Sequence, residues 1–169
     1  MAEEIVEQGY RELADTILEH NPGVDLGRVR AAFELADRAH SGQKRKAGTP
    51  YVTHCVAAAQ ICAEMGLDED SIVAALLHDC IEDTAITHED IARQFGAEVA
   101  DIVEGVTKLT RVQFTSREDE QMENLRKMLM AMAKDIRVIL IKIADRLHNM
   151  RTMEYMVAQK QLEKSLETM

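Results

Sequence analysis

Prolines are rare in this chain and stand between its periodic apolar segments. The 169 residues include only two prolines and eight glycines. Both prolines, Pro22 and Pro50, stand where a helix would end or begin rather than inside one. Between such stops, apolar side chains recur at helical spacing, as with Ile5, Leu13 and Ile17. We therefore predict an all-α fold.

Capping residues mark several boundaries of the predicted helices. Asp25, Asp68 and Thr87 are suited to cap helix N-termini, and Gly96 is suited to end a helix. The segment RVILIKIA has the β-branched content of a strand, but ADRLHNM continues it without a breaker, which favours a helix. The predicted helices cover residues 2–19, 26 to about 40, 50–65, 69–84, 88–95, 97–106, 119–133 and 136–158. No repeat or interdomain linker interrupts them, so we expect one domain.

Composition and charge exclude several classes of function. The longest aliphatic stretch, VILI, is too short to span a bilayer, and the initial MAEEIVEQ lacks the basic residues of a signal peptide. We expect a cytoplasmic protein without membrane association, whose three cysteines are reduced core thiols. The net charge of −10 argues against nucleic-acid binding, so an anionic ligand needs a local basic patch.

The stretch LLHDCIEDT, residues 76–84, places four polar side chains in an apolar run. On one continuous helix, His78, Asp79, Glu82 and Asp83 would share a face opposite an apolar face. A solvated polar face is one interpretation. However, three acids at the C-terminal end of a helix oppose its dipole, and a bound cation would offset them.

A second polar group lies in IADRLHNMRT. Asp145, Asn149 and Thr152 project along one stripe of the predicted helix, and the same stripe carries core residues upstream. Asp145 therefore lies at the edge of the core, where an acid needs a partner. That partner is Arg146 or Arg151 in one interpretation and a metal ion in the other.

His54 completes the set that a metal would require. A lone histidine near a helix start is commonly a core or capping group. Together with His78, Asp79 and Asp145, however, it supplies two imidazoles and two carboxylates, which suit Mn²⁺, Fe²⁺ or Zn²⁺ with positions left for water and substrate.

Local positive charge is concentrated in the KRK triplet at residues 44–46. The triplet is either an ordinary surface loop or the basic patch that an anionic substrate needs. Lys108 is a candidate for a second phosphate contact.

These motifs together resemble the hydrolase domain of the RelA/SpoT-type alarmone enzymes, a branch of the HD superfamily of metal-dependent phosphohydrolases. The resemblance covers about residues 30–169. It rests on the blocks HSGQKRKAGTPYVTH, ALLHDCIEDT, GVTKL and NLRKMLMAMAKDIRVILIKIADRLHNMRT, which occur in the family's order. It implies a compact multi-helix HD-domain bundle.

The resemblance also implies roles for individual residues. One divalent metal ion, usually Mn²⁺, would be held by His54, His78, Asp79 and Asp145. Glu82 and Asp83 would act on the attacking water, and the nucleotide would contact Arg45, Lys46, Asn149 and Thr152. The implied reaction removes the 3′-pyrophosphate of ppGpp or pppGpp and gives GDP or GTP and pyrophosphate. Where the family usually has Arg-Lys-Ser-Gly, residues 45–48 are Arg-Lys-Ala-Gly, which lacks one hydroxyl for substrate contacts.

The chain stops at Met169, partway through a predicted helix, whereas family members with both activities continue into synthetase and regulatory domains. We therefore expect residues 1–169 to be the single HD-type hydrolase domain of a longer bifunctional protein, whose parent chain would also be a GTP pyrophosphokinase.

Three alternatives stay open. The domain could be catalytically silent and regulate an attached ppGpp synthetase. It could be an HD phosphohydrolase that acts on another nucleotide. It could also be a helical interaction module without enzymatic activity, whose exposed face would not need these acids.

Overall fold

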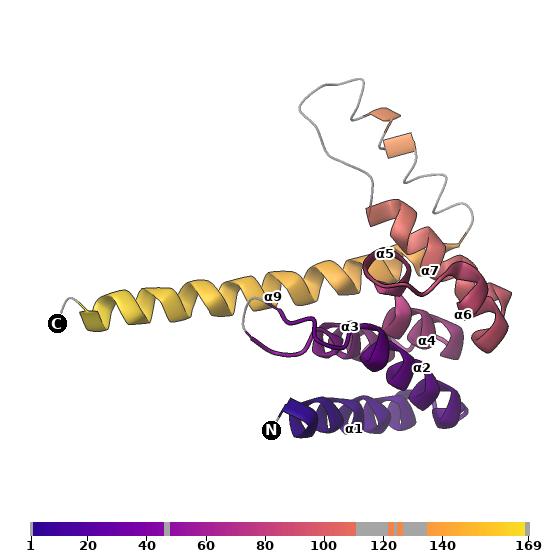
Figure 1. The fold of residues 1–169 in the computed structure, drawn as a ribbon, viewed down its shortest axis with the longest axis horizontal. Helices are drawn as coiled ribbons and strands as arrows, with labels where there is room; N and C mark the ends of the chain where they lie inside the picture. Colours follow the sequence, from indigo (N-terminus) through magenta and orange to yellow (C-terminus); the bar gives the residue numbers. More distant parts are fainter. Residues whose placement is uncertain (1, 46–47, 111–121, 124, 127–134, 168–169) are drawn as a thin grey trace.

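The structure is a computed structural model that describes residues 2–45, 48–110, 122–123, 125–126 and 135–167 (Figure 1). Within these ranges the only pairing of extended backbone is an isolated bridge between Lys44 and Pro50. The helices are α1 (Ala2–His20), α2 (Leu26–Ala39), α3 (Val52–Glu64), α4 (Glu69–Leu77), α5 (Cys80–Asp83), α6 (His88–Phe95), α7 (Ala97–Thr110) and α9 (Ile136–Glu167). The prediction of an all-α fold is confirmed.

The predicted caps form as expected. The side chain of Asp25 accepts hydrogen bonds from the backbone of residues 27 and 28, and that of Asp68 accepts one from the Ser71 backbone. Thr87 and Asp90 form a reciprocal capping box at the start of α6. Gly96, with a φ of 101°, ends α6 in a conformation that favours glycine.

Two helices are longer than predicted. α7 extends to Thr110 rather than residue 106, and α9 extends to Glu167 rather than residue 158. Neither extension contains glycine or proline, so nothing in the local sequence ends the helix there. The helix predicted at 119–133 falls mostly outside the described residues.

α3 and α4 occupy the centre of the bundle. α1, α4 and α9 pack on α3, while α2 and α7 pack on α4. Figure 1 shows α9 crossing the bundle and projecting beyond it. Cys55, Cys62 and Cys80 are buried free thiols, as predicted. In the described part of the chain, no helix combines the length and apolar character that crossing a bilayer requires.

Two arginines join the helix ends around α4. The Arg28 guanidinium pairs with Glu69 and Asp70 in the first turn of α4 and also donates to the Phe95 carbonyl oxygen at 2.6 Å. Arg137, near the start of α9, bonds to three carboxylates: those of Asp68, which caps α4, of Glu98 on α7, and of Asp135, directly before α9. The Arg137 contacts tie the start of α9 to the starts of α4 and α7.

Close packing of α7 on α9 provides a test of this arrangement. A Cβ atom at Gly105 would lie 2.8 Å from Cγ2 of the buried Val138. Because the branched valine side chain is stiff, we expect Gly105→Ala to overpack this contact. The cost, about 1–3 kcal/mol, exceeds the helix-propensity gain of about 1 kcal/mol, so urea denaturation should show a lower free energy of unfolding.

Gly9→Ala is the matched control, because its Cβ would meet Val56 at an ordinary 3.6 Å. We expect this variant to gain up to about 1 kcal/mol. Equal gains in the two variants would contradict the proposed contact between α7 and α9.

Candidate metal centre

His78 and Asp79 lie in a break between helices. α4 ends at Leu77 and α5 begins at Cys80, so the single helix predicted over residues 69–84 is wrong at this point. The His78 ring competes with the backbone: its Nδ1 donates to the Ala75 carbonyl oxygen at 2.6 Å, the acceptor that the Asp79 N–H would use in a continuous helix. Because of this break, the side chains of the adjacent residues His78 and Asp79 point to the same place, with Nε2 and Oδ2 3.0 Å apart.

Four side chains from three regions of the sequence meet there. His54 Nε2 from α3 lies 2.5 Å from Oδ1 of Asp145 on α9. His78 Nε2 lies 3.2 Å from the same oxygen and 3.0 Å from Asp79 Oδ2. His54 Nε2 and Asp79 Oδ2 are 3.9 Å apart. We call His54, His78, Asp79 and Asp145 the four-residue cluster; each member offers a ligand atom, and these atoms lie within 4.8 Å of one another.

The cluster is withdrawn from solvent. The side chains of His54 and His78 are 1% exposed, that of Asp145 9% and that of Asp79 13%. Asp145 therefore does not lie in a surface pair with Arg146 or Arg151. Its partners are the two histidines and Lys142, whose Nζ donates to Oδ2 at 3.1 Å.

Burial and charge shift the pKa values of the cluster in different directions. Burial lowers the pKa of His54. Burial acts in the same direction on His78, but the negative charges of Asp79 and Asp145 outweigh it and raise the pKa of His78 to about 10. Burial by itself would raise the pKa of both acids. The histidine contacts instead lower the pKa of Asp79 to about 2 and that of Asp145 well below its usual range.

Both carboxylates are therefore ionised at neutral pH, as metal ligands must be. A cation in the cluster would have to displace a proton from His78. Two imidazole nitrogens and two carboxylate oxygens within this span fit a divalent transition-metal ion.

Residues outside the cluster orient its ligands. The Tyr51 hydroxyl donates to Asp79 Oδ2 at 2.7 Å, and Nδ1 of His54 lies 2.7 Å from Nδ1 of His148. Burial lowers the pKa of His148 to about 4, so its ring is neutral at pH 7. The sequence interpretation missed Tyr51, Lys142 and His148 as partners. Tyr51 stands in HSGQKRKAGTPYVTH and His148 in RLHN, but neither position by itself indicates what the side chain contacts.

Two predicted nucleotide contacts also meet, although 104 positions separate them. Arg45 Nη2 donates to Asn149 Oδ1 at 2.9 Å. Among the described residues, the buried Nε of Arg45 has no hydrogen-bond partner. The Thr152 hydroxyl donates to the His148 carbonyl oxygen at 2.8 Å. Lys46 lies outside the described residues.

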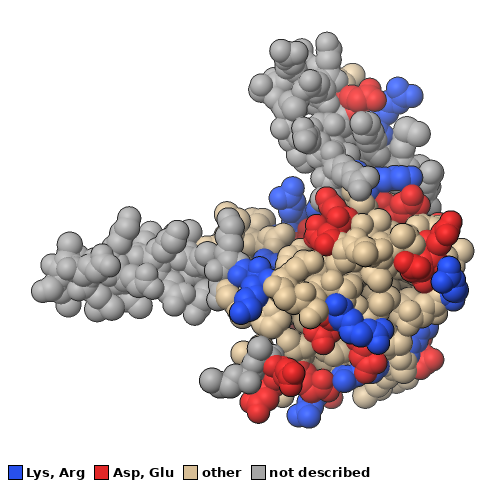
Figure 2. All heavy atoms as spheres, in the orientation of Figure 1, with Lys and Arg blue, Asp and Glu red and all other residues tan. Residues whose placement is uncertain are grey.

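Glu82 and Asp83 are exposed on α5, directly after the helix break. Partial burial and the negative charge of Asp79 raise the pKa of Asp83. Lys108, the other candidate phosphate contact, is exposed and pairs with Glu104, with 3.8 Å between Nζ and Oε1. On the face shown in Figure 2, basic residues are interspersed with acidic ones rather than gathered into one large patch.

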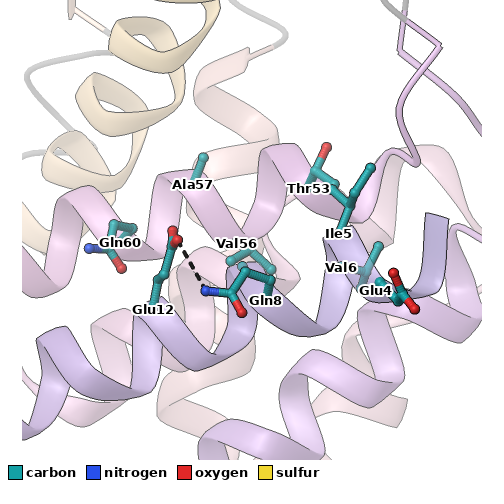
Figure 3. Close-up of a pocket in the computed structure, with 10 residues that line it drawn as sticks. Glu4, Ile5, Val6, Gln8, Glu12, Thr53, Val56, Ala57 and Gln60 are labelled. Carbon is teal, nitrogen blue, oxygen red and sulfur yellow. Dashed lines mark hydrogen bonds between the residues drawn. The ribbon is translucent and has the colours of Figure 1, made fainter. Parts of the chain in front are cut away.

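A cavity of about 660 Å³ lies elsewhere, between α1 and α3 (Figure 3). Its polar lining includes Gln8, Glu12 and Gln60, with a 3.5 Å hydrogen bond from Gln8 to Glu12. None of the predicted site residues lines it. No histidine that the structure describes lines this cavity, and it therefore lacks the combination of histidines and aspartates found in the four-residue cluster. We do not regard it as the catalytic site.

Comparison with known proteins shows the family of the chain. The HD domain family model matches residues 32–169. An Escherichia coli K12 protein named bifunctional (p)ppGpp synthase/hydrolase SpoT is 48% identical over 160 residues, which cover 95% of this chain and 23% of the relative. A Haemophilus influenzae protein named guanosine-3′,5′-bis(diphosphate) 3′-pyrophosphohydrolase is 51% identical over 135 residues, covering 80% of this chain and 20% of the relative.

A solved structure is also similar. It is described as a metazoan ortholog of SpoT that hydrolyzes ppGpp and plays a role in starvation responses. The match has a TM-score of 0.59 and 33% identity, and it covers 76% of this chain and 71% of the other. The chain spans about a fifth of the length of the curated relatives above. Because the family model matches residues 32–169 and the solved SpoT ortholog is 33% identical over 71% of its own length, the chain belongs to the HD-domain family, in the group that includes the SpoT-type proteins.

Proposed function

We propose that this chain is a metal-dependent hydrolase domain that removes the 3′-pyrophosphate of ppGpp or pppGpp. The products would be GDP or GTP and pyrophosphate. The observation that carries this proposal is the buried four-residue cluster, which fits a divalent cation and lies beside α5 with its two acids. The names of the relatives support ppGpp as the substrate. This proposal also implies a cytoplasmic location, where guanine nucleotides are available.

His54, His78, Asp79 and Asp145 would hold the cation, for which we propose Mn²⁺ on the basis of the nitrogen and oxygen donor set and the family resemblance. When bound, such a cation polarises a phosphoryl oxygen and lowers the pKa of a coordinated water. The remaining chemistry belongs to the side chains around the cluster.

Glu82 would take the proton from the attacking water, and Asp83 would orient that water or protonate the leaving 3′-oxygen. The raised pKa of Asp83 favours the protonated form that donation requires. Arg45 and Asn149 would contact the nucleotide, since Arg45 keeps a buried Nε donor without a partner among the described residues. Lys46 and Thr152 remain proposed contacts on the family resemblance alone.

We propose that the 169 residues act as one hydrolase domain. Relatives of the SpoT type are several times longer than this chain. We therefore do not propose for this chain the synthase activity in the name of the E. coli protein. The competing proposals are a catalytically silent domain and a phosphohydrolase that acts on another nucleotide.

The direct test is ppGpp turnover by metal-stripped protein with and without Mn²⁺. We expect release of GDP and pyrophosphate only when Mn²⁺ is present. An adenine analogue with the same 3′-pyrophosphate should turn over at least about tenfold more slowly, because one lost specific polar contact costs about 1.4 kcal/mol or more.

Stoichiometric Mn²⁺ binding without turnover would instead support a silent domain. Equal turnover of the adenine analogue would favour a phosphohydrolase of broader specificity.

A further inference from the structure

The His54 and His148 rings meet head to head. Their Nδ1 atoms are 2.7 Å apart, their centroids are 4.9 Å apart, and their planes differ by 31°. The centroid distance is close to the nitrogen separation plus one ring radius on each side. The two nitrogens therefore lie nearly on the line between the rings, where one N–H points at the other lone pair.

One proton occupies that contact, and its position decides which His54 nitrogen is available. If His148 donates, the neutral His54 ring carries its hydrogen on Nε2, where it can donate to Asp145 Oδ1 at 2.5 Å. If His148 accepts, His54 carries its hydrogen on Nδ1, and Nε2 presents a lone pair toward the cluster. Only the second arrangement allows His54 Nε2 to bind a cation.

For His78, only one tautomer fits its hydrogen-bond partner. Its Nδ1 lies 2.6 Å from the Ala75 carbonyl oxygen, which can only accept a hydrogen bond. A neutral His78 ring is therefore committed to a lone pair at Nε2. The two histidines of the four-residue cluster thus differ. The Ala75 carbonyl oxygen sets the tautomer of His78, whereas His54 contacts the His148 ring, which can either donate or accept a hydrogen bond.

We propose that His148 is a positioning residue that sets the tautomer and ring orientation of His54, and that the shared proton shifts from His148 to His54 when the cluster takes up a metal ion. In balance, the His54 Nε2 proton is released to solvent, the shared proton moves to His54 Nδ1, and His148 takes one proton from solvent on Nε2. Both rings stay neutral. This inference rests on the proposed metal centre.

The position of His148 on α9 suits this role. Asp145 precedes it by three residues, so one face of the helix supplies both a cluster member and the partner of another. The His148 ring faces His54 of α3, while the Thr152 hydroxyl, one turn later, donates to the His148 backbone carbonyl oxygen. The same packing of α9 on α3 therefore sets both contacts.

Two substitutions separate hydrogen bonding from packing. His148→Leu keeps a side chain of similar bulk but removes the acceptor, whereas His148→Asn places an oxygen near the former Nδ1 position. We measure the Mn²⁺ dissociation constant from the electron paramagnetic resonance signal of free Mn²⁺. It should rise about 10–100-fold in the leucine variant. The asparagine variant should restore it to within about threefold of the parent value.

His20→Leu is the histidine control, because His20 is exposed at the end of α1 and bonds only to the nearby Thr16 carbonyl oxygen among the described residues. Thermal unfolding of each metal-free variant verifies folding. Equal affinity in the leucine variant and the parent would overturn the proposal. Equal losses in the leucine and asparagine variants would also overturn it, because packing would then explain the effect.

The unmodified chain gives an independent readout. Two-bond ¹H–¹⁵N spectra of the histidine rings, recorded without metal and with diamagnetic Zn²⁺, report which nitrogen of His54 carries hydrogen. We expect hydrogen on Nε2 without metal and on Nδ1 with Zn²⁺; an unchanged tautomer would overturn the proposed shift. If the parent chain binds neither ion, the metal centre itself fails, whereas binding without dependence on His148 removes only this inference.

Discussion

Replacing Asp145 with asparagine is expected to abolish measurable Mn²⁺ binding and to lower ppGpp turnover by about 10³-fold or more, since several kcal/mol of charge stabilisation would be lost. Oδ1 of Asp145 contacts both cluster histidines, and Oδ2 accepts from Lys142. An asparagine side chain cannot satisfy both sides. Either its NH₂ group faces the Lys142 ammonium, or it turns toward the cation position and removes a ligand.

Metal binding and GDP release should be measured on the same preparation of Asp145→Asn. Asp37→Asn, which alters an exposed acid on α2, serves as the charge-matched control and should stay within about twofold of the parent activity. The result that would contradict the prediction is an Asp145→Asn protein that folds, binds Mn²⁺ and retains more than a tenth of the parent turnover.

Replacing Glu82 with glutamine is expected to separate metal binding from chemistry. Glu82 is an exposed residue of α5 and is not among the buried ligand atoms, so the Mn²⁺ dissociation constant should change by less than about threefold. Turnover at saturating ppGpp should fall by about 10²–10⁴-fold, the usual contribution of a positioned general base. Stopped assays for pyrophosphate, with Mn²⁺ binding measured in parallel, test both expectations.

Glu89→Gln provides a control for loss of an exposed glutamate, because Glu89 lies in the first turn of α6. We expect it to leave turnover within about twofold. A Glu82→Gln enzyme with normal turnover would exclude Glu82 as the general base. Loss of Mn²⁺ binding in that variant would instead assign Glu82 to the metal centre.

Local sequence was sufficient for most of the helices because their boundaries depend on neighbouring residues. Asp25, Asp68 and Thr87 bond to backbone groups only a few positions away, and these caps form as predicted. The choice of helix over strand for α9 was also correct, since no breaker follows its β-branched start. The ends of α7 and α9 were predicted too early. The residues beyond the predicted ends include no glycine or proline, so the local sequence does not mark where these helices stop.

The membership of the four-residue cluster was predicted from the residue types together with the family resemblance, and the structure brings these residues together. Periodicity alone left Asp145 with two possible kinds of partner. His54 lies 91 positions away in the sequence, so only the packing of α9 on α3 decides that the two side chains meet.

The sequence by itself determined an all-helical chain, its main caps and a set of residues suited to metal-dependent hydrolysis. Tertiary structure decided the break at His78 and Asp79, the partner of Asp145 and the contact between His54 and His148. The physical reason is the range of the interactions. Caps and helical periodicity act over a few residues, whereas the cluster forms only when packing buries polar groups that must then satisfy one another.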